Sequence, residues 1–585
     1  MISKLLIRKY KNDQILTLKM KKALSLVFYE IKKYKKLIFM GAFLIITTSL
    51  LALPDYFFLG IIVDRILPGK DYRIFIIFVL CMLLLKILIT YFNYNVKMIF
   101  FKVNNKITID IRKRLFEKTN KLPLKHIENF STGYLMSRIQ DDPPRVSALF
   151  GDQIINLLKQ VVVFTISIVA LLFINFKLAI ITILQLPFLV YTVHHYGNKI
   201  KKQADKVFEH VSLLSKSLHE NINMIPTCKY FGATNYNVTR YIRTSLVTLK
   251  HFISLRKLEC TNSLVMGILG SILPMTIISI GVYDIMYSNF TLGLLITFMS
   301  ILSTSVGSIC EVISFYPELK KIDVALLRIG NMLIMETDNS NEVCYDEKIT
   351  KIKLNNVSFS YEENKKVLDN ISFTVTTGMK VAIVGHSGCG KTTLTKILAG
   401  FYDFQGEIVI NDLTIDSKSR NLLSKKVSIV PQESFLFNES IFKNVSIGSV
   451  EVDKTKVNNA LKKAKADEFV KKLNGSIHSK VGEGGNKLSV GEKQRISIAR
   501  SLAKGCDILI LDEATSNIDN VSKNMILESI DELSKYMIVF IIDHNFENIK
   551  DCDAILVFDN GKLVESGRED ELISFKGIYA SLIGY

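Results

Sequence analysis

Six apolar runs dominate the first half of the chain. They lie near residues 37–63, 74–94, 154–174, 178–196, 264–286 and 292–315. Each is close to the roughly 20 residues that a helix needs to cross a bilayer. The segments 64–73, 175–177 and 287–291 between them are short, whereas 95–153 and 197–263 are long and have a helical pattern. The pattern predicts six spanning helices whose two long connections lie on one side of a membrane.

The pattern changes at about residue 350, where short β-rich runs begin to alternate with helical stretches. The β-rich runs are Ile352–Phe359, Val381–Val384, Val427–Val430, Ile508–Leu511, Ile538–Ile542 and Ile555–Val557. This alternation predicts an α/β domain with a mainly parallel sheet. We therefore predict an all-α six-helix transmembrane domain followed by that domain. The predicted boundaries are a basic N-terminal segment with an interfacial helix at 1–36, the membrane domain at 37–330, a linker at 331–349 and the α/β domain at 350–585.

Positive charge predicts the orientation of the helices. Residues 1–36, 95–153 and 195–262 together carry thirty-three Lys and Arg, whereas the three short segments carry four. Basic residues are enriched on the cytosolic side of membrane proteins. Both termini and both long connections are therefore expected in the cytosol.

Composition supports a membrane protein rather than a nucleic-acid-binding one. The chain is 49% hydrophobic and has a formal net charge of +19, and its basic residues cluster beside the apolar runs. We therefore expect no nucleic-acid partner. The eight cysteines include no CxxC pair, which favours free thiols over a disulfide framework.

The stretch Gly385–Thr392 reads GHSGCGKT and fits the phosphate-loop pattern of Gly, four residues and Gly-Lys-Thr. The apolar Lys380–Val384 before it predicts a buried strand, and Thr392–Ala399 after it predicts a helix. Backbone N–H groups and the positive end of the helix dipole would then face phosphate. Lys391 is placed to reach the β- and γ-phosphates of ATP, and Thr392 to hold Mg²⁺.

A second pattern that indicates a Mg²⁺ site is the run Ile508–Glu513, in which four apolar residues are followed by Asp512 and Glu513. It predicts a buried strand that ends at the nucleotide. Asp512 would hold Mg²⁺ through water, and Glu513 would polarise the attacking water. Alone, the run also fits an ordinary sheet strand. Its pairing with the phosphate loop favours an ATP-hydrolysing site.

Taken together, these motifs resemble the ABC transporters, and specifically exporters in which six helices precede an ATPase domain. The most specific mark is Leu488–Glu492, LSVGE, followed by Lys-Gln-Arg, which is similar to the family signature LSGGQ. In the family this segment opens a helix and binds the γ-phosphate of ATP held by the other protomer. Ser489 and Gly491 match, whereas Val490 and Glu492 depart from the usual Gly and Gln.

The resemblance implies roles for further residues. Tyr361 matches the aromatic residue that stacks on adenine, and Gln432 the residue that contacts Mg²⁺ and water. Asp519 matches a loop that crosses the dimer interface, and His544 the switch histidine at the γ-phosphate. Two helices that couple the domains are expected at Ile225–Asn235 and near His126–Val146.

The predicted site residues fall into three groups. Glu513, His544 and Gln432 are the predicted catalytic residues, and Thr392, Gln432 and Asp512 the predicted Mg²⁺ ligands. Nucleotide contacts are expected from Tyr361, Gly385, His386, Ser387, Gly388, Cys389, Gly390, Lys391, Thr392, Thr393, Ser489, Gly491 and Asp519.

The resemblance implies an ATP-driven exporter in the plasma membrane of a bacterium, acting as a homodimer in contact with membrane lipid. Its cofactors would be ATP and Mg²⁺. A peptide is the favoured substrate, with a lipid or drug as the alternative and an ATP-gated sensor or channel as a different class. Six apolar runs exclude a soluble ATPase. Lys86 and Glu311 lie within apolar runs, where ionisable side chains commonly line a cavity, and their different depths argue against a direct pair.

Overall fold

The computed structural model describes residues 14–148, 153–288, 290–338, 347–362, 365–417, 419–449, 453–516 and 518–584. The chain forms two compact units. Unit 1 comprises residues up to 120 and 130–335, and unit 2 comprises 121–129 and the residues from 336 onward. Residues 1–13 of the predicted N-terminal segment and 339–346 of the predicted linker lie outside the described residues. A helical region followed by an α/β domain confirms the predicted fold class.

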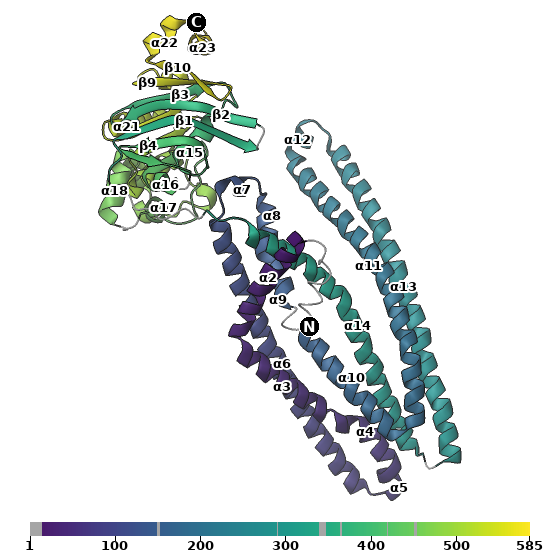
Figure 1. Ribbon diagram of the computed structural model, residues 1–585. Coiled ribbons are helices and arrows are strands. Elements are labelled where there is room, and N and C mark those ends of the chain that lie inside the picture. Colours follow the sequence, from purple (N-terminus) through teal and green to yellow (C-terminus); the bar gives the residue numbers. More distant parts are fainter. Residues whose placement is uncertain are drawn as a thin grey trace. The chain divides into compact units, whose positions relative to one another are not determined.

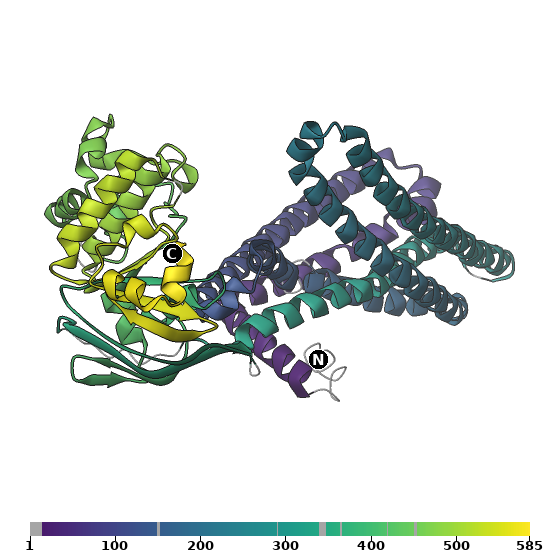
Figure 2. The same cartoon turned by 90° about the horizontal axis from the view of Figure 1, so that it is seen from above.

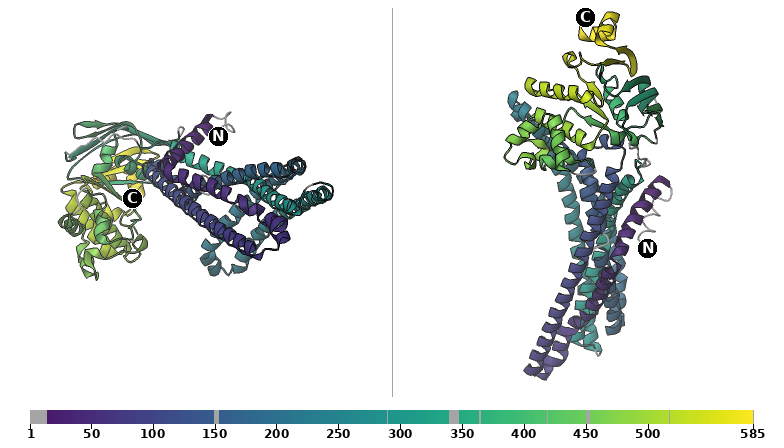
Figure 3. Two further views of the ribbon diagram at one scale, coloured as in Figure 1. Left: turned by 90° about the horizontal axis from the view of Figure 1, so that it is seen from below. Right: turned by 90° about the vertical axis from the view of Figure 1, so that its left-hand side faces the viewer.

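Unit 1 is built from helices (Figure 1). They are α2 (Gln14–Lys33), α3 (Lys35–Leu51), α4 (Leu53–Ile61), η1 (Ile62–Ile66), α5 (Leu67–Gly69), α6 (Tyr72–Asn120), α8 (Thr132–Met136), η2 (Ser137–Asp141), α9 (Asp142–Ala148), α10 (Ile154–Ile174), α11 (Phe176–Asn223), α12 (Ile225–Tyr230), α13 (Thr234–Tyr287) and α14 (Leu292–Ile334). The long helices of this unit run in roughly the same direction (Figure 3, right), and α11 packs along α13, α10 along α14 and α3 along α6.

The apolar runs form helices of the length that a membrane requires. Among the described residues, five helical stretches are long and apolar enough to span: Lys35–Gly69, Tyr72–Asn120, Ile154–Ile174, Thr234–Tyr287 and Leu292–Val312. A shorter apolar stretch, Phe176–Gln185, opens α11. Many of these spans' large apolar side chains are exposed, as expected of surfaces that face lipid tails.

The short turns between spans are closed by polar side chains. Asn175 accepts a hydrogen bond from the N–H of Leu178 at 3.1 Å and so starts α11. Thr291 accepts one from Leu294 at 3.2 Å and starts α14. Such caps satisfy N–H groups that the first turn of a helix leaves unpaired.

Unit 2 contains two sheets. The four-stranded antiparallel sheet has the order β2-β1-β4-β5, and the six-stranded sheet the order β10-β9-β3-β8-β7-β6. In the larger sheet β3, β6, β7, β8 and β9 are mutually parallel, and β10 pairs antiparallel with β9. The strands are β1 (Lys351–Glu362), β2 (Lys365–Thr376), β3 (Lys380–Gly385), β4 (Gln405–Ile410), β5 (Leu413–Ile415), β6 (Val427–Val430), β7 (Ile508–Asp512), β8 (Ile538–Ile542), β9 (Ala554–Asp559) and β10 (Lys562–Gly567).

Strand β3 is buried on both faces, as its continuous apolar sequence predicts. Val381 and Ile383 point into one hydrophobic cluster, and Ala382 and Val384 into another. The alternation follows from the two-residue period of a strand. The carboxyl end of β3, where the phosphate loop begins, is therefore held rigidly between two packed layers.

The helices of unit 2 include a group, drawn in yellow-green, that lies on one side of the strands (Figure 2). The helices of this unit are α7 (Leu124–Glu128), α15 (Lys391–Leu398), α16 (Asn421–Lys426), α17 (Ile441–Ser446), α18 (Lys454–Lys463), α19 (Asp467–Lys472), η4 (Ser476–His478), η5 (Glu483–Gly485), α20 (Val490–Lys504), α21 (Asn520–Ser534), η6 (Phe546–Asn548), α22 (Glu569–Phe575) and α23 (Ile578–Ile583).

Candidate functional site

The loop between β3 and α15 has a backbone that only glycine adopts easily. Gly385, Gly388 and Gly390 have φ values of 151°, 83° and 104°. A Cβ on Gly385 would lie 2.1 Å from the carbonyl oxygen of Phe558, whereas a Cβ on Gly388 would meet nothing within 4 Å. The loop is thus packed against the sheet at its start and open at its middle. That open backbone, ahead of a helix N-terminus, fits a phosphate group.

Lys391 is the first residue of α15, and its side chain folds back over the loop. Its Nζ donates hydrogen bonds to the carbonyl oxygens of Gly385 at 2.7 Å and His386 at 3.0 Å. The ammonium group is thereby held inside the curve of the loop and is nearly buried. Thr392 and Thr393 follow in the first turn of the same helix. The structure thus brings the whole predicted phosphate loop together.

The acid pair lies at the carboxyl end of β7. Parallel strands β3, β7 and β8 end at the same edge of the sheet, so Asp512 and Glu513 share that edge with the phosphate loop. Burial raises the pKa of Asp512, and the neighbouring charge of Glu513 raises it further. A divalent cation would offset this cost, and the Thr392 hydroxyl and Gln432 amide carry oxygen atoms of the kind that Mg²⁺ prefers.

Glu513 adopts a left-handed backbone with φ of 51°, which is uncommon outside glycine. Its N–H donates to the carbonyl oxygen of Ile542 at 2.9 Å, which fixes the turn. Its carboxylate Oε1 lies 2.9 Å from Nε2 of His544. Such strained residues cluster at functional sites because the surrounding structure must hold them in place. The predicted base and the predicted switch histidine are therefore direct partners.

A buried carboxylate that the sequence reasoning missed supports His544. Asp543 accepts hydrogen bonds from Thr515, from Nδ2 of Asn548 at 2.6 Å and, through its other oxygen, from the N–H of Asn545 at 2.8 Å. Thr515 follows the acid pair, and Asn545 and Asn548 follow the histidine. Asp543 therefore ties the segment after β7 to the segment after β8. The only signal in the sequence was its position immediately before His544.

The loop that carries Gln432 is held by α20, the helix that begins within the signature. Buried Gln494 of α20 donates to the carbonyl oxygens of Pro431 at 3.0 Å and Gln432 at 2.7 Å, and accepts from Ser434 at 2.7 Å. The Gln432 side chain itself donates to Ser516 at 3.4 Å. Gln494 thus connects the signature helix to the Gln432 loop within one chain, a contact that no sequence pattern indicated.

The signature residues form the start of α20. Ser489 accepts a hydrogen bond from the N–H of Glu492 at 3.3 Å, and the Glu492 carboxylate accepts one from the N–H of Ser489 at 2.8 Å. This reciprocal pair is a capping box, a role that Glu fills as well as Gln. A Cβ on Gly491 would lie 2.5 Å from Cβ of Ser522, so glycine is required there by packing against α21.

Asp519 starts that neighbouring helix. It accepts a hydrogen bond from the N–H of Ser522 at 2.9 Å, and this bond lowers the pKa of the Asp519 carboxyl. Because Gly491 packs on Ser522, the signature and the Asp519 loop form one surface of unit 2.

Tyr361 lies in a cluster of aromatic rings beside α15. Its ring meets those of Phe359 and Tyr402 edge-on, at centroid distances of 5.0 and 5.7 Å. Its hydroxyl lies 3.2 Å from Oγ1 of Thr393, which connects the ring to the phosphate-loop helix. Tyr361 is 41% exposed, so part of it is accessible to a ligand.

The short helix α7 packs on this cluster although it lies far away in the sequence. Lys125 donates to the carbonyl oxygen of Tyr361 at 2.7 Å. Glu128 accepts two hydrogen bonds from Nζ of Lys396, at 2.8 and 3.0 Å, and one from the Tyr402 hydroxyl at 2.5 Å. Lys396 belongs to α15. Residues 121–129, which follow α6 directly, thus contact the helix that carries Lys391.

The second expected coupling segment forms α12 between the long helices α11 and α13 (Figure 1). Tyr230 and Phe231 at its end are 84% and 80% exposed. In the membrane helices, Lys86 pairs with Asp55 at 3.1 Å, and Glu311 accepts from Gln160 at 2.6 Å.

Comparison with known proteins agrees with this geometry. Residues 368–516 match the family model described as "ABC transporter", and residues 37–309 match the "ABC transporter transmembrane region". An ATP-dependent lipid A-core flippase of Desulfotalea psychrophila is 29% identical over 572 residues, covering 96% of this chain and 99% of the relative. A protein of Rickettsia felis named as an export ATP-binding/permease protein is 30% identical over 491 residues, covering 82% of this chain and 84% of that one.

One relative from Bacillus subtilis, YgaD, is named as a multidrug export ATP-binding/permease protein; it is 29% identical over 563 residues, covering 94% of this chain and 97% of its own length. Among solved structures, a bacterial Atm1-family ABC exporter with ATP bound superimposes with a TM-score of 0.80 at 24% identity, covering 94% of this chain and 99% of that one. This last likeness concerns the fold.

Proposed function

The chain belongs to the ABC transporters, with a transmembrane region followed by an ATPase domain, and we propose that it exports an amphipathic molecule from the cytosol as a pair of identical chains. Its ATPase domain binds nucleotide, and hydrolysis is coupled to transport. The observation on which the proposal rests is the Glu513–His544 pair, 2.9 Å apart, at the sheet edge that also holds the Lys391 loop.

The proposed substrate differs from the peptide that the sequence favoured. That preference rested on family resemblance, and no relative cited above is named as a peptide exporter. Relatives named as lipid A-core flippases or as a multidrug exporter favour the lipid or drug alternative instead. Lipids and many drugs each combine an apolar body with a polar group, and we therefore propose an amphipathic substrate.

In the proposed mechanism each chain contributes half of two ATP sites. Lys391 and the loop around it hold the β- and γ-phosphates, and Ser489 at the start of α20 of the second chain meets the γ-phosphate from the other side. Thr392, Gln432 and Asp512 would hold Mg²⁺, which would neutralise charge on the phosphates. ATP then joins the two ATPase domains, and its hydrolysis releases them.

Glu513 accepts a proton from the attacking water, and its partner His544 holds the carboxylate in place through Nε2, 2.9 Å away. Such positioning by fixed groups is the main source of catalysis in phosphoryl transfer. The α7 and α12 segments are proposed to pass the opening and closing of the ATPase pair to the membrane helices, which alternate between two states. The basic segments 1–36, 95–153 and 195–262 support a cytosolic location for the ATPase domain, in the plasma membrane of a bacterium.

The test is hydrolysis by purified protein in vesicles. Glu513→Gln should bind ATP yet turn it over about 10²–10⁴-fold more slowly, because a positioned general base is lost. Glu547→Gln is the matched control, since this exposed acid lies three residues after His544. Near-normal hydrolysis by Glu513→Gln would contradict the assignment.

The same preparation separates a transporter from an ATP-gated sensor or channel. A transporter moves substrate in proportion to ATP hydrolysed, so Glu513→Gln should stop accumulation in inside-out vesicles. A gated channel would let substrate equilibrate in the mutant as soon as ATP binds.

A further inference from the structure

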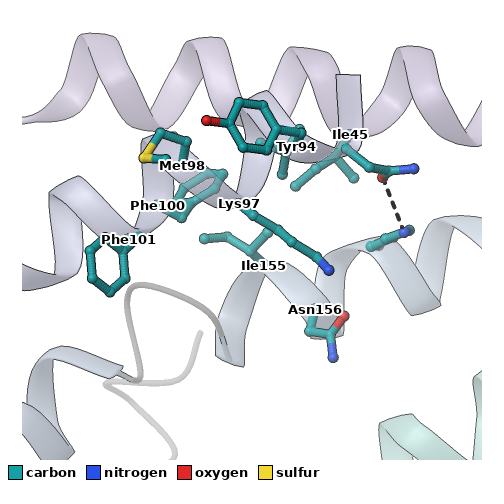
Figure 4. A pocket seen from close by; sticks show the side chains of 11 residues that line it. Ile45, Tyr94, Lys97, Met98, Phe100, Phe101, Ile155 and Asn156 are labelled. Atoms are coloured by element: carbon teal, nitrogen blue, oxygen red, sulfur yellow. Dashed lines mark hydrogen bonds between the residues drawn. The ribbon is translucent and has the colours of Figure 1, made fainter. Parts of the chain in front are cut away.

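A cavity of about 510 Å³ lies between α3, α6 and α10 of unit 1 (Figure 4). The residues that line the cavity form an apolar group and a polar group. Ile45, Phe100 and Ile155 are among the apolar residues, and Asn93, Lys97 and Lys159 are among the polar ones. In Figure 4 the Lys97 side chain extends toward the side where Asn156 lies. The cavity therefore has an apolar wall and a wall with two ammonium groups.

The apolar wall is firmly packed. Ile45, Val96 and Phe100 are each less than 10% exposed and form one hydrophobic cluster. Phe100 lies so close to α3 that a Cβ on Gly41 would be 2.3 Å from its ring. Phe101, by contrast, is 60% exposed at the rim of the cavity. The wall is thus preformed, and an apolar chain lying on it would be shielded from water.

The two cationic groups are not neutralised within the described part of the chain. Lys159 donates to the Asn93 side chain at 3.4 Å, and no ion pair of Lys97 or Lys159 occurs among the described residues. The carboxylate of Glu311 accepts a hydrogen bond from Gln160 at 2.6 Å and one from Asn156, which lines the cavity, at 3.4 Å. Lys97 is exposed and Lys159 is half-buried, so both ammonium groups are accessible to a ligand in the cavity. The site is therefore complementary to an anion.

The cavity lies at the end of the spanning segments where the cytosol is expected. Lys97 follows Tyr72, the first residue of α6, by twenty-five positions, roughly 37 Å along a helix. This exceeds the hydrocarbon thickness of about 30 Å, so Lys97 lies at the level of lipid head groups. Lys159 is in the second turn of α10, which starts at Ile154 and enters the membrane from the same side.

The geometry points to a binding site for an amphiphile of the cytosolic leaflet that has an anionic head group, held by Lys97 and Lys159, and an alkyl chain, held against Ile45 and Phe100. This assignment rests on the proposed export function and narrows its substrate class. It argues against basic peptides, which two unpaired lysines would repel. Another cavity of unit 1 is lined by Lys86, but that lysine forms an ion pair with Asp55 and so does not offer a free positive charge to an anion.

The first experiment measures ATP hydrolysis in nanodiscs of zwitterionic lipid. Lysophosphatidic acid, lysophosphatidylcholine of the same chain length, inorganic phosphate and a basic amphipathic peptide are added separately. Lysophosphatidic acid should stimulate hydrolysis with saturation, and the other three should not. Lys97→Gln and Lys159→Gln should each raise its half-saturating concentration about tenfold, the effect of one lost charge-assisted hydrogen bond. Basal hydrolysis should be unchanged.

Lys102→Gln is the matched control, since it removes the same charge from the same helix outside the cavity. A second measurement needs no hydrolysis. The chain contains no Trp, so Phe101→Trp places a single indole at the rim. Lysophosphatidic acid with a brominated chain should quench its fluorescence, and Lys159→Gln in this background should shift the titration about tenfold.

Equal responses to lysophosphatidic acid and lysophosphatidylcholine, or equal effects of Lys97→Gln and Lys102→Gln, would overturn the site. Stimulation by phosphate alone would show an anion site without the chain-binding wall, and stimulation by the peptide would overturn the charge argument. If the wild type hydrolyses no ATP, the proposed function fails, yet the fluorescence titration still decides whether the site binds an anionic amphiphile.

Discussion

The contact between α7 and the ATPase domain can be tested by changing Glu128 to Gln. This carboxylate receives two hydrogen bonds from Lys396 and one from the hydroxyl of Tyr402. Gln keeps one oxygen but replaces the other by an amide that cannot accept. We expect residues 121–129 to detach more often and substrate-stimulated hydrolysis to fall, while basal hydrolysis, which needs only the ATP site, is kept.

The magnitude follows from the exposure of each partner. The Glu128 and Lys396 side chains are 39% and 22% exposed, so solvent screens their ion pair to roughly 0.5 kcal/mol. Tyr402 is 2% exposed, and its bond to a carboxylate contributes about 1.5 kcal/mol. The sum of about 2 kcal/mol corresponds to roughly a 30-fold change in the docking equilibrium.

Hydrogen exchange measured by mass spectrometry reports this equilibrium directly. The amides of His126 and Ile127 in α7 donate to the carbonyl oxygen of Pro123, which precedes the helix, and their exchange should accelerate about 30-fold in Glu128→Gln. Tyr402→Phe should accelerate this exchange about tenfold. The variant that combines Tyr402→Phe with Glu128→Gln should accelerate it by less than the product of the two single effects, because both changes remove the same hydrogen bond.

Glu117→Gln is the control, since that acid lies on exposed α6 with a weak pair to Lys113 at 3.9 Å. Unchanged exchange in Glu128→Gln would refute the energetic reasoning. A loss of basal hydrolysis as large as the loss of stimulation would refute the coupling role.

Two further predictions concern the ATP site. Burial raises the pKa of Asp512 in the folded chain, so its contribution to stability is present at low pH and lost as the pH rises through that raised pKa. Without Mg²⁺ at neutral pH, Asp512→Asn should therefore melt no lower than the wild type in calorimetry, while Mg²⁺-dependent hydrolysis falls about 10–100-fold; a lower melting temperature would contradict the burial argument. Glu492→Gln preserves the cap on Ser489, so stability should change by less than about 0.5 kcal/mol. In the proposed pair of chains, Glu492 lies beside the ATP held by the second chain, and its negative charge repels the phosphates. Glu492→Gln should therefore lower KM for ATP about fivefold, and an unchanged KM would contradict this position of Glu492.

Much of the fold and of the site was predictable because the signals are local. The strand, glycine loop and helix around Lys391 occupy consecutive residues, as do β7 and its acid pair. Apolar runs of spanning length predicted the membrane helices for the same reason. The phosphate loop, the acid pair and His544 lie at one sheet edge because the parallel strands β3, β7 and β8 end together there, whereas Tyr361 lies on β1 of the other sheet and Ser489 at the start of α20.

Other features depend on residues that the sequence separates widely. Glu128 and Tyr402 are 274 positions apart, and Gln494 lies 62 positions from the Gln432 carbonyl that it holds. Strand β1 was predicted, but its place in a separate antiparallel sheet with β2, β4 and β5 was not.

The sequence alone therefore determined which segments are helices, strands and phosphate-binding turns, since hydrophobic period and glycine placement act over a few residues. Only the tertiary structure decided that α7 packs on α15, that Asp543 ties two loops together, and that Lys97 and Lys159 share a cavity. Such contacts depend on how helices and sheets pack, which sets distances between segments that no local pattern encodes.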